Sequence, residues 1–179
     1  CRDNNLTSLD VNANTSLTIL RCQANELTAL DVSSNTALTD LSCYTNQLTY
    51  LNMKNGVTDQ LSTFNATDNS LTCIEVLDTD IDWATTNWTS VNGNIDEGVT
   101  FSEICSGNPN YTNVPDDNFE QALIDLGYDD TLDDYVLTEN ISSVTYLNVS
   151  NDSISDLTGI EGFTALTTLY CHDNQLDTL

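Results

Sequence analysis

The sequence predicts a mainly β protein with little helix, in which short strands stack into a solenoid with a parallel sheet along its concave face. The first observation is a 21-residue period, because Cys1, Cys22 and Cys43 occupy the same position in three successive repeats. The second is the return of the pattern near the other end with a period of 22, which pairs Leu147 with Leu169. The third is the loss of the repeat between these two blocks. A fixed period of this length is the signature of a stacked-coil architecture.

Each L-x-C or L-x-L segment is expected to form a short strand, with neighbouring strands roughly 4.7 to 4.9 Å apart. The leucines would point into one continuous core, since no single repeat can bury its apolar side alone. One asparagine position recurs with the same period, at Asn4, Asn25 and Asn46. We expect these amides to be interior and to bond backbone groups of their own and the adjacent coil.

The stretches LTILRCQANEL, LTDLSCYTNQL and LTTLYCHDNQL fit the pattern L-x-x-L-x-L-x-x-N/C-x-L. On these residues the chain resembles the leucine-rich-repeat family, over residues 1–76 and 144–179. The Thr-rich and Asn-rich repeats resemble those of secreted and surface proteins of Bacteroidota, and the 22-residue copies resemble internalin-type repeats. The resemblance implies that the solenoid is of the leucine-rich-repeat type.

Four cysteines recur at the strand position, namely Cys1, Cys22, Cys43 and Cys171. On neighbouring parallel strands the Cβ vectors run side by side, which holds the Cβ atoms wider apart than a disulfide prefers. We interpret all four as buried thiols that stay reduced.

The remaining two cysteines, Cys73 and Cys105, bracket a segment that has lost the repeat but keeps apolar residues such as Trp83 and Trp88. Resemblance to capping segments of the family implies that residues 73–105 close the first array and that Cys73 and Cys105 form a disulfide. Such a bridge would indicate an oxidising compartment, and we expect a secreted or cell-surface protein. From the residues alone, two further free thiols remain the alternative, because sequence does not fix connectivity.

The next stretch, residues 106–115, is polar and holds both prolines, so it is expected to be a linker. Helix signals follow, with Asp117 as N-cap, Glu120 three residues later and Gly127 as a stop. We expect residues 116–143 to form a helical N-terminal cap and residues 144–179 to start a second array. Since this order runs from closing cap to opening cap, we expect the chain to be a window onto a longer array whose ends are covered by further repeats.

The chain carries 28 acidic residues against three Lys and Arg, a formal net charge of -25 at pH 7. This charge excludes nucleic acids and anionic membrane surfaces as electrostatic partners. No apolar run reaches the length of about 18 residues that a membrane-spanning helix needs, so no direct membrane insertion is expected.

Two acidic runs hold oxygen ligands of the kind that Ca²⁺ prefers. The first comprises Asp78, Asp80 and Asp82, and the second Asp129, Asp130, Asp133 and Asp134. Neither run has the glycine or distal Glu of an EF-hand, so solvated loops are the alternative, and no other cofactor is expected. Resemblance to the Bacteroidota proteins implies O-glycosylation in D-S/T-apolar triplets, at Thr131, Ser153 and Thr178.

No motif for nucleophilic, metal-dependent or phosphate chemistry is present, and we predict no enzymatic activity. The single histidine, His172, follows Cys171, but successive side chains on a strand face opposite sides. The residues between the leucines would instead line a concave face suited to polar recognition. The candidates on this face are Arg21, Gln23, Ser42, Tyr44, Tyr146, Tyr170 and His172.

Two functions fit these observations. The first is a structural module, repeated along an extracellular array or filament through head-to-tail contacts between copies, because a heterologous contact that does not close builds an open filament. The alternative is a surface adhesin module that binds a protein or polysaccharide through its concave face.

Overall fold

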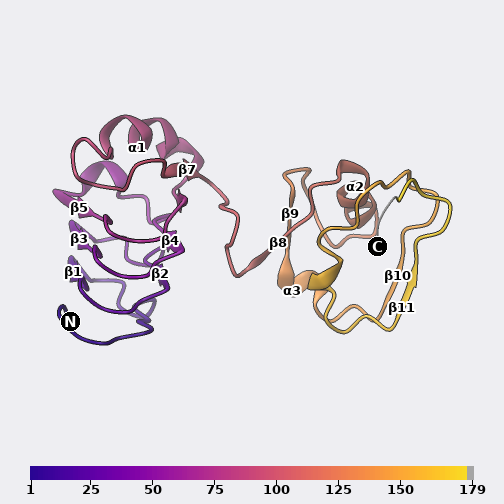
Figure 1. Ribbon diagram of the computed structural model, residues 1–179, viewed down its shortest axis with the longest axis horizontal. Helices are drawn as coiled ribbons and strands as arrows, with labels where there is room; N and C mark the ends of the chain where they lie inside the picture. Colours follow the sequence, from indigo (N-terminus) through magenta and orange to yellow (C-terminus); the bar gives the residue numbers. More distant parts are fainter. Residues whose placement is uncertain (177–179) are drawn as a thin grey trace. The chain divides into compact units, whose positions relative to one another are not determined.

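The computed structural model describes residues 1–176, which form two compact units, Cys1–Gly107 and a second that begins at Asn108. Most regular segments are three-residue strands, and the helices are few and short (Figure 1). The protein is therefore mainly β with parallel sheets, as the sequence predicts. No described helix is long and apolar enough to cross a membrane.

The first sheet of the first unit contains strands that the leucine positions predict. They are β1 (Ile19–Arg21), β3 (Asp40–Ser42) and β5 (Thr63–Asn65), all parallel. The central residues Leu20, Leu41 and Phe64 lie in register and are buried. Each coil therefore contributes one strand and one large apolar side chain to this side of the core.

A second parallel sheet runs through the same coils, and it was not predicted. Its strands are β2 (Ala29–Asp31), β4 (Tyr50–Asn52), β6 (Cys73–Glu75) and β7 (Thr100–Ser102), and a short turn of helix, η1 (Thr58–Gln60), lies between β4 and β5 in the sequence. The central residues Leu30, Leu51 and Ile74 are at most 1% exposed. Each coil thus supplies leucines to one core from two sides, so the expectation of a single sheet per array was incomplete.

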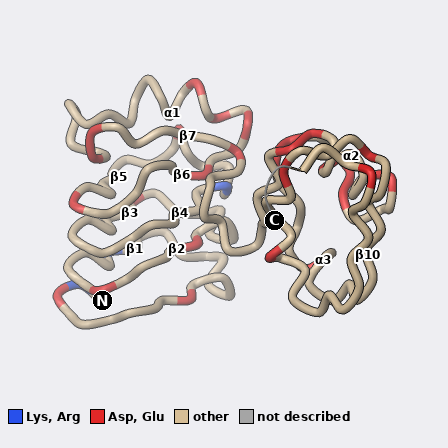
Figure 2. Tube along the Cα trace, turned by 45° about the vertical axis from the view of Figure 1, so that its right-hand side comes forward, with Lys and Arg blue, Asp and Glu red and all other residues tan. Residues whose placement is uncertain are grey.

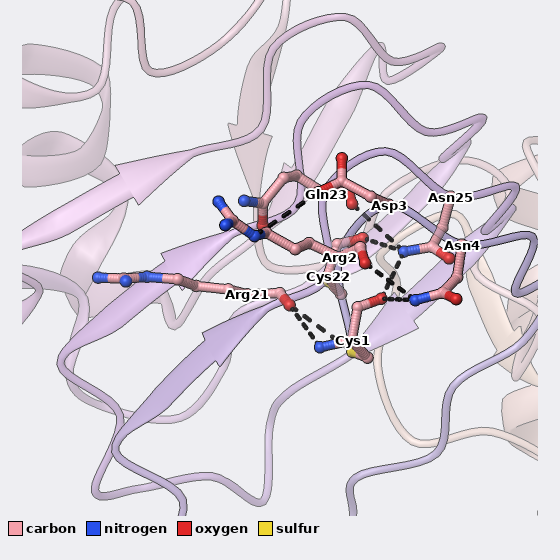
Figure 3. Close-up of polar contacts among 8 residues, drawn as sticks. All are labelled: Cys1, Arg2, Asp3, Asn4, Arg21, Cys22, Gln23 and Asn25. Atoms are coloured by element: carbon pink, nitrogen blue, oxygen red, sulfur yellow. Dashed lines mark hydrogen bonds and ion pairs between the residues drawn. The ribbon is translucent and has the colours of Figure 1, made fainter.

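The recurring asparagines tie each coil to its neighbour. Asn25 Nδ2 donates to the carbonyl of Cys22 (2.9 Å) in its own coil and to that of Cys1 (3.0 Å) in the coil before. Asn25 Oδ1 accepts from the Leu6 N–H (3.0 Å). Figure 3 shows the amides of Asn4 and Asn25 one above the other, both directed at the Cys1 carbonyl. The same pattern of bonds recurs at Asn46, Asn69 and Asn174.

We expect Asn46→Ala to lower the free energy of unfolding of the first unit by about 2 kcal/mol, because it leaves the buried Leu27 N–H without its acceptor and removes an amide donor from the Cys43 carbonyl. The Leu27 N–H lies 3.1 Å from Asn46 Oδ1, and the Cys43 carbonyl lies 2.9 Å from Asn46 Nδ2 but also accepts from Asn69 Nδ2 at 3.2 Å. Urea unfolding followed by tryptophan fluorescence measures the loss. Gln47→Ala is the matched control, since Gln47 is exposed and next in sequence; an equal loss in both variants would contradict the assigned role.

Residues 78–105 pack against the last coil of the first unit. They include η2 (Asp78–Asp80) and α1 (Ile81–Asn87). Trp88 stacks on Phe64 with ring centroids 3.9 Å apart, and Trp83 meets Trp88 edge-on at 5.8 Å. A disulfide joins Cys73 to Cys105, the pair that the family resemblance implies. The segment is thus fixed to the coils by aromatic packing and by a covalent bond.

The other four cysteines are free thiols. Cys22 and Cys43 are buried as expected, and burial raises the pKa of Cys22 to about 11. Cys1 is exposed and Cys171 is half-buried, so the expectation of burial was wrong for both. Each lies in an outermost coil of the described residues, where a neighbouring coil packs on one side only.

The second unit holds two pairs of strands. β8 (Tyr111–Asn113) pairs antiparallel with β9 (Tyr135–Leu137), and β10 (Tyr146–Asn148) pairs parallel with β11 (Thr168–Tyr170). Its helical segments are α2 (Asp117–Asp125), α3 (Thr138–Ile141) and η3 (Ile160–Gly162). The structure differs here from the predicted linker, because β8 lies within it. Pairing with β9 and complete burial of Val114 make residues 108–115 part of the second unit.

Helix α2 begins and ends with recognisable caps. Asp116, not the predicted Asp117, is the N-cap, and its Oδ1 accepts from the N–H groups of Asn118 and Phe119, each at 3.0 Å. Asp116 has the extended backbone that an N-cap requires, whereas Asp117 is already helical. The predicted stop is found, since Gly127 takes a left-handed φ of 79° just after the helix.

Candidate ligand-binding face

The outward-facing side chains of the strands form the surface most open to a ligand. Alternation along β10 and β11 turns Leu147 and Leu169, which lie in register, toward the core of the second unit. The same alternation turns Tyr146 and Tyr170 outward, and they are 54% and 46% exposed. Large aromatic side chains are thus left uncovered on a regular sheet.

Tyr146, Tyr170 and His172 lie next to one another, and we call these three residues the tyrosine stripe. The two tyrosine rings have centroids 5.7 Å apart and are tilted by 54°. The His172 ring follows at 6.5 Å from Tyr170, nearly perpendicular to it. The tyrosines meet diagonally across the sheet, because Tyr146 lies opposite Thr168 in the strand register. The stripe therefore spans both strands as one aromatic surface.

His172 points away from the core, as the alternation predicts. Its Nδ1 lies 2.9 Å from Asp173 Oδ2, and both side chains are largely exposed. Cys171 instead packs against the core cluster of the second unit. The neighbouring Cys and His therefore face opposite sides of the strand and do not form a nucleophile–base pair.

The corresponding face of the first unit is less accessible. Arg21 reaches diagonally to Asp40, with Nη2 2.5 Å from Oδ2, and Asp40 is only 7% exposed. Gln23 and Ser42 are buried and Tyr44 is half-buried. Of the predicted face residues in this unit, only Arg21 presents most of its side chain to solvent. Of the predicted face residues, only those of the tyrosine stripe form an exposed aromatic surface.

Charge is distributed unequally between the two units. The three basic residues, Arg2, Arg21 and Lys54, all precede residue 107. Half of the 28 acidic residues lie in the second unit, which has no Lys or Arg to offset them. Figure 2 shows this contrast, with blue segments confined to the first unit and red segments in both. The tyrosine stripe thus belongs to the more uniformly acidic unit.

A cavity of about 350 Å³ lies in the segment that packs against the last coil of the first unit. Trp88, Phe101 and Ile95 supply apolar wall, and Asp96 supplies the carboxylate. That carboxylate already accepts hydrogen bonds from the N–H groups of Asp68 and Asn69, each at 3.0 Å. The Asp96 carboxylate is thus engaged in holding the last coil. The cavity was not predicted, because no repeat positions the residues that line it.

The two acidic runs lie in different units. Asp78, Asp80 and Asp82 fall on η2 and α1, whereas Asp129, Asp130, Asp133 and Asp134 follow α2. Among residues 1–176 no group of three or more His, Cys, Asp or Glu side chains is placed to hold a metal ion. Burial raises the pKa of Asp129, and the nearby Asp133 and Asp130 add to this effect.

The positions suggested for O-glycosylation remain predictions. Thr131 and Ser153 are both exposed, in loops of the second unit. Thr178 lies outside the described residues. Exposure of the hydroxyl-bearing residue is a requirement for modification, and the two described positions meet it.

The chain matches no protein-family model. It is similar to internalin J of Listeria monocytogenes serotype 4b (strain F2365), with 38% identity over 65 residues. That match covers 36% of this chain and only 7% of the relative. A solved structure, described as the functional domain of InlJ from Listeria monocytogenes that includes a cysteine ladder, covers 97% of this chain and 44% of its own, at 24% identity and a TM-score of 0.42.

Proposed function

We propose that the chain is an extracellular leucine-rich-repeat module that binds a macromolecular ligand through the tyrosine stripe. The observation that carries the proposal is the exposure of two adjacent tyrosines on a regular sheet. Tyrosine supplies a large contact area at low entropic cost and is enriched among the residues that dominate binding energy. The Cys73–Cys105 disulfide and the similarity to internalin J support a surface or secreted location.

We expect replacement of both tyrosines, Tyr146→Ala with Tyr170→Ala, to weaken capture of any stripe ligand by roughly tenfold or more. Arrays of purified extracellular proteins and of glycans, probed with the wild-type chain and the variant, measure this. Leu132→Ala is the matched control, because Leu132 is 51% exposed in the same unit but lies outside the sheet. Equal capture by the double variant would place the ligand elsewhere and contradict the proposal.

A filament built from copies of the chain is the second candidate. Among the described residues, β11 is outermost in its parallel sheet, and residues 1–4 are the outermost extended segment of the first unit, since their N–H groups donate to the carbonyls of Arg21, Gln23 and Ala24. An extended edge of this kind is a surface on which a further strand can pair. Sedimentation velocity over a range of concentrations tests this candidate. A mass that rises with concentration supports head-to-tail assembly, whereas a constant monomer mass counts against it.

A further inference from the structure

The second unit combines exposed aromatic faces with an uncompensated negative charge. It contains no Lys or Arg and half of the acidic residues of the chain. Its strand face exposes Tyr146 and Tyr170 by about half of their surface. A ligand that docks on this face therefore meets aromatic rings within a negative field, and that field attracts cations and repels anions.

We propose that the partner of the tyrosine stripe is a basic protein segment whose arginine or lysine side chains pack over the two tyrosine rings. The inference rests on the proposed function, because it names the class of partner for the same face. The electron-rich face of a tyrosine attracts a cation that lies within about 6 Å of the ring centroid. Because the centroids of the two tyrosine rings are 5.7 Å apart, one guanidinium placed above the pair lies within about 6 Å of both.

A second contact point lies at the end of the stripe. The Asp173 carboxylate is 71% exposed and lies beside His172, with Oδ2 2.9 Å from Nδ1. It can accept hydrogen bonds from a second basic side chain of the partner, and bonds between ionised groups are the stronger kind. A segment with two basic residues would thus engage the rings with one and Asp173 with the other.

Neutral sugars also stack on aromatic rings, but the charge of the second unit adds nothing to their binding. An anionic segment or polysaccharide would meet like charge wherever it approached this unit, since no Lys or Arg is present to pair with it. Only a basic partner uses both features of the surface, the aromatic faces and the excess of carboxylates.

The experiment uses the whole chain and three synthetic peptides of equal length, with alternating Arg–Ser, Glu–Ser and Gly–Ser sequences. Nuclear magnetic resonance titration measures affinity and location together. We expect only the Arg–Ser peptide to bind, to shift the ring signals of Tyr146, Tyr170 and His172, and to bind less tightly as salt is added. The Tyr146→Ala, Tyr170→Ala double variant should bind it roughly tenfold more weakly.

Two variants, each of which removes one negative charge, distinguish a local contact at the stripe from the general negative field of the second unit. Asp173→Asn should weaken Arg–Ser binding several-fold, at about the strength of a partly exposed charged contact. Asp125→Asn should leave it nearly unchanged, since Asp125 lies on α2 and bonds Gln121. Equal losses of affinity in Asp173→Asn and Asp125→Asn would show attraction by net charge alone and overturn the inference. Wild-type affinity in the double tyrosine variant would do the same. A neutral or acidic ligand whose capture depends on both tyrosines overturns it as well, yet leaves the proposed function standing.

Discussion

Replacing Cys73 and Cys105 together by serine is expected to lower the free energy of unfolding of the first unit by about 4 kcal/mol. The bridged residues are separated by 32 positions, so the disulfide removes much of the freedom of that loop in the unfolded chain. The bridge also fixes the Cys105 N–H, which donates to Glu75 Oε1 at 3.0 Å. Because Glu75 is 1% exposed, loss of this donor weakens the pairing of a buried carboxylate.

The measurement is unfolding in denaturant, followed by tryptophan fluorescence. Both tryptophans, Trp83 and Trp88, lie inside the loop that the disulfide closes, so their signal reports this part of the molecule. Cys1→Ser is the control, since Cys1 is an exposed free thiol and its replacement should change the stability little. Mass spectrometry of unreduced peptides should recover the Cys73–Cys105 pair. A bridge between Cys22 and Cys43 instead would contradict the stacking of the coils.

The repeat predicted the strands that carry one large leucine per coil, but not the second sheet. Leu20 and Leu41 fall in phase with the cysteine and asparagine positions, so period and residue type agree there. The second-sheet strand Ala29–Asp31 has one leucine flanked by a small and a polar residue. Such a segment gives no alternation of its own, and its extended form is set by the neighbouring coils that pair with it.

At the candidate face, the solvent exposure of a side chain was harder to predict than the side of the strand to which it points. The strand period turns Ser42 and Tyr170 outward alike, yet Ser42 is buried and Tyr170 is 46% exposed. Ser42 is a short side chain beside Arg21, with which it lies in register, whereas Tyr170 extends beyond its neighbours Asn148 and Thr168. The length of the flanking side chains decides accessibility, and that requires the strand register as well as the period.

Asp116→Ala is expected to lower the free energy of unfolding of the second unit by about 3 kcal/mol, more than an ordinary helix cap would. Oδ1 caps α2, while Oδ2 accepts from the Ser155 hydroxyl at 2.6 Å and from the N–H groups of Ser155 and Asp156. One carboxylate thus joins the helix to a loop about 40 positions away in the sequence. Its removal leaves donors from two segments without an acceptor.

The matched control is Asp117→Ala, which removes the same charge from the first turn of α2 but no capping bond, and it should cost less than about 1 kcal/mol. Burial by itself raises the pKa of Asp116, but the bonds from Ser155, Phe119 and Asp156 outweigh it and leave the pKa below its ordinary value. A depressed pKa means that the stabilisation is present above the unfolded value of about 3.9 and is lost as the pH falls through the folded value. Thermal unfolding of both variants at neutral pH, and of Asp116→Ala and the wild type down to strongly acidic pH, measures this. The difference in stability between wild type and Asp116→Ala should become smaller in acid. An equally large loss of stability in Asp117→Ala at neutral pH would show that charge, not capping geometry, stabilises the helix.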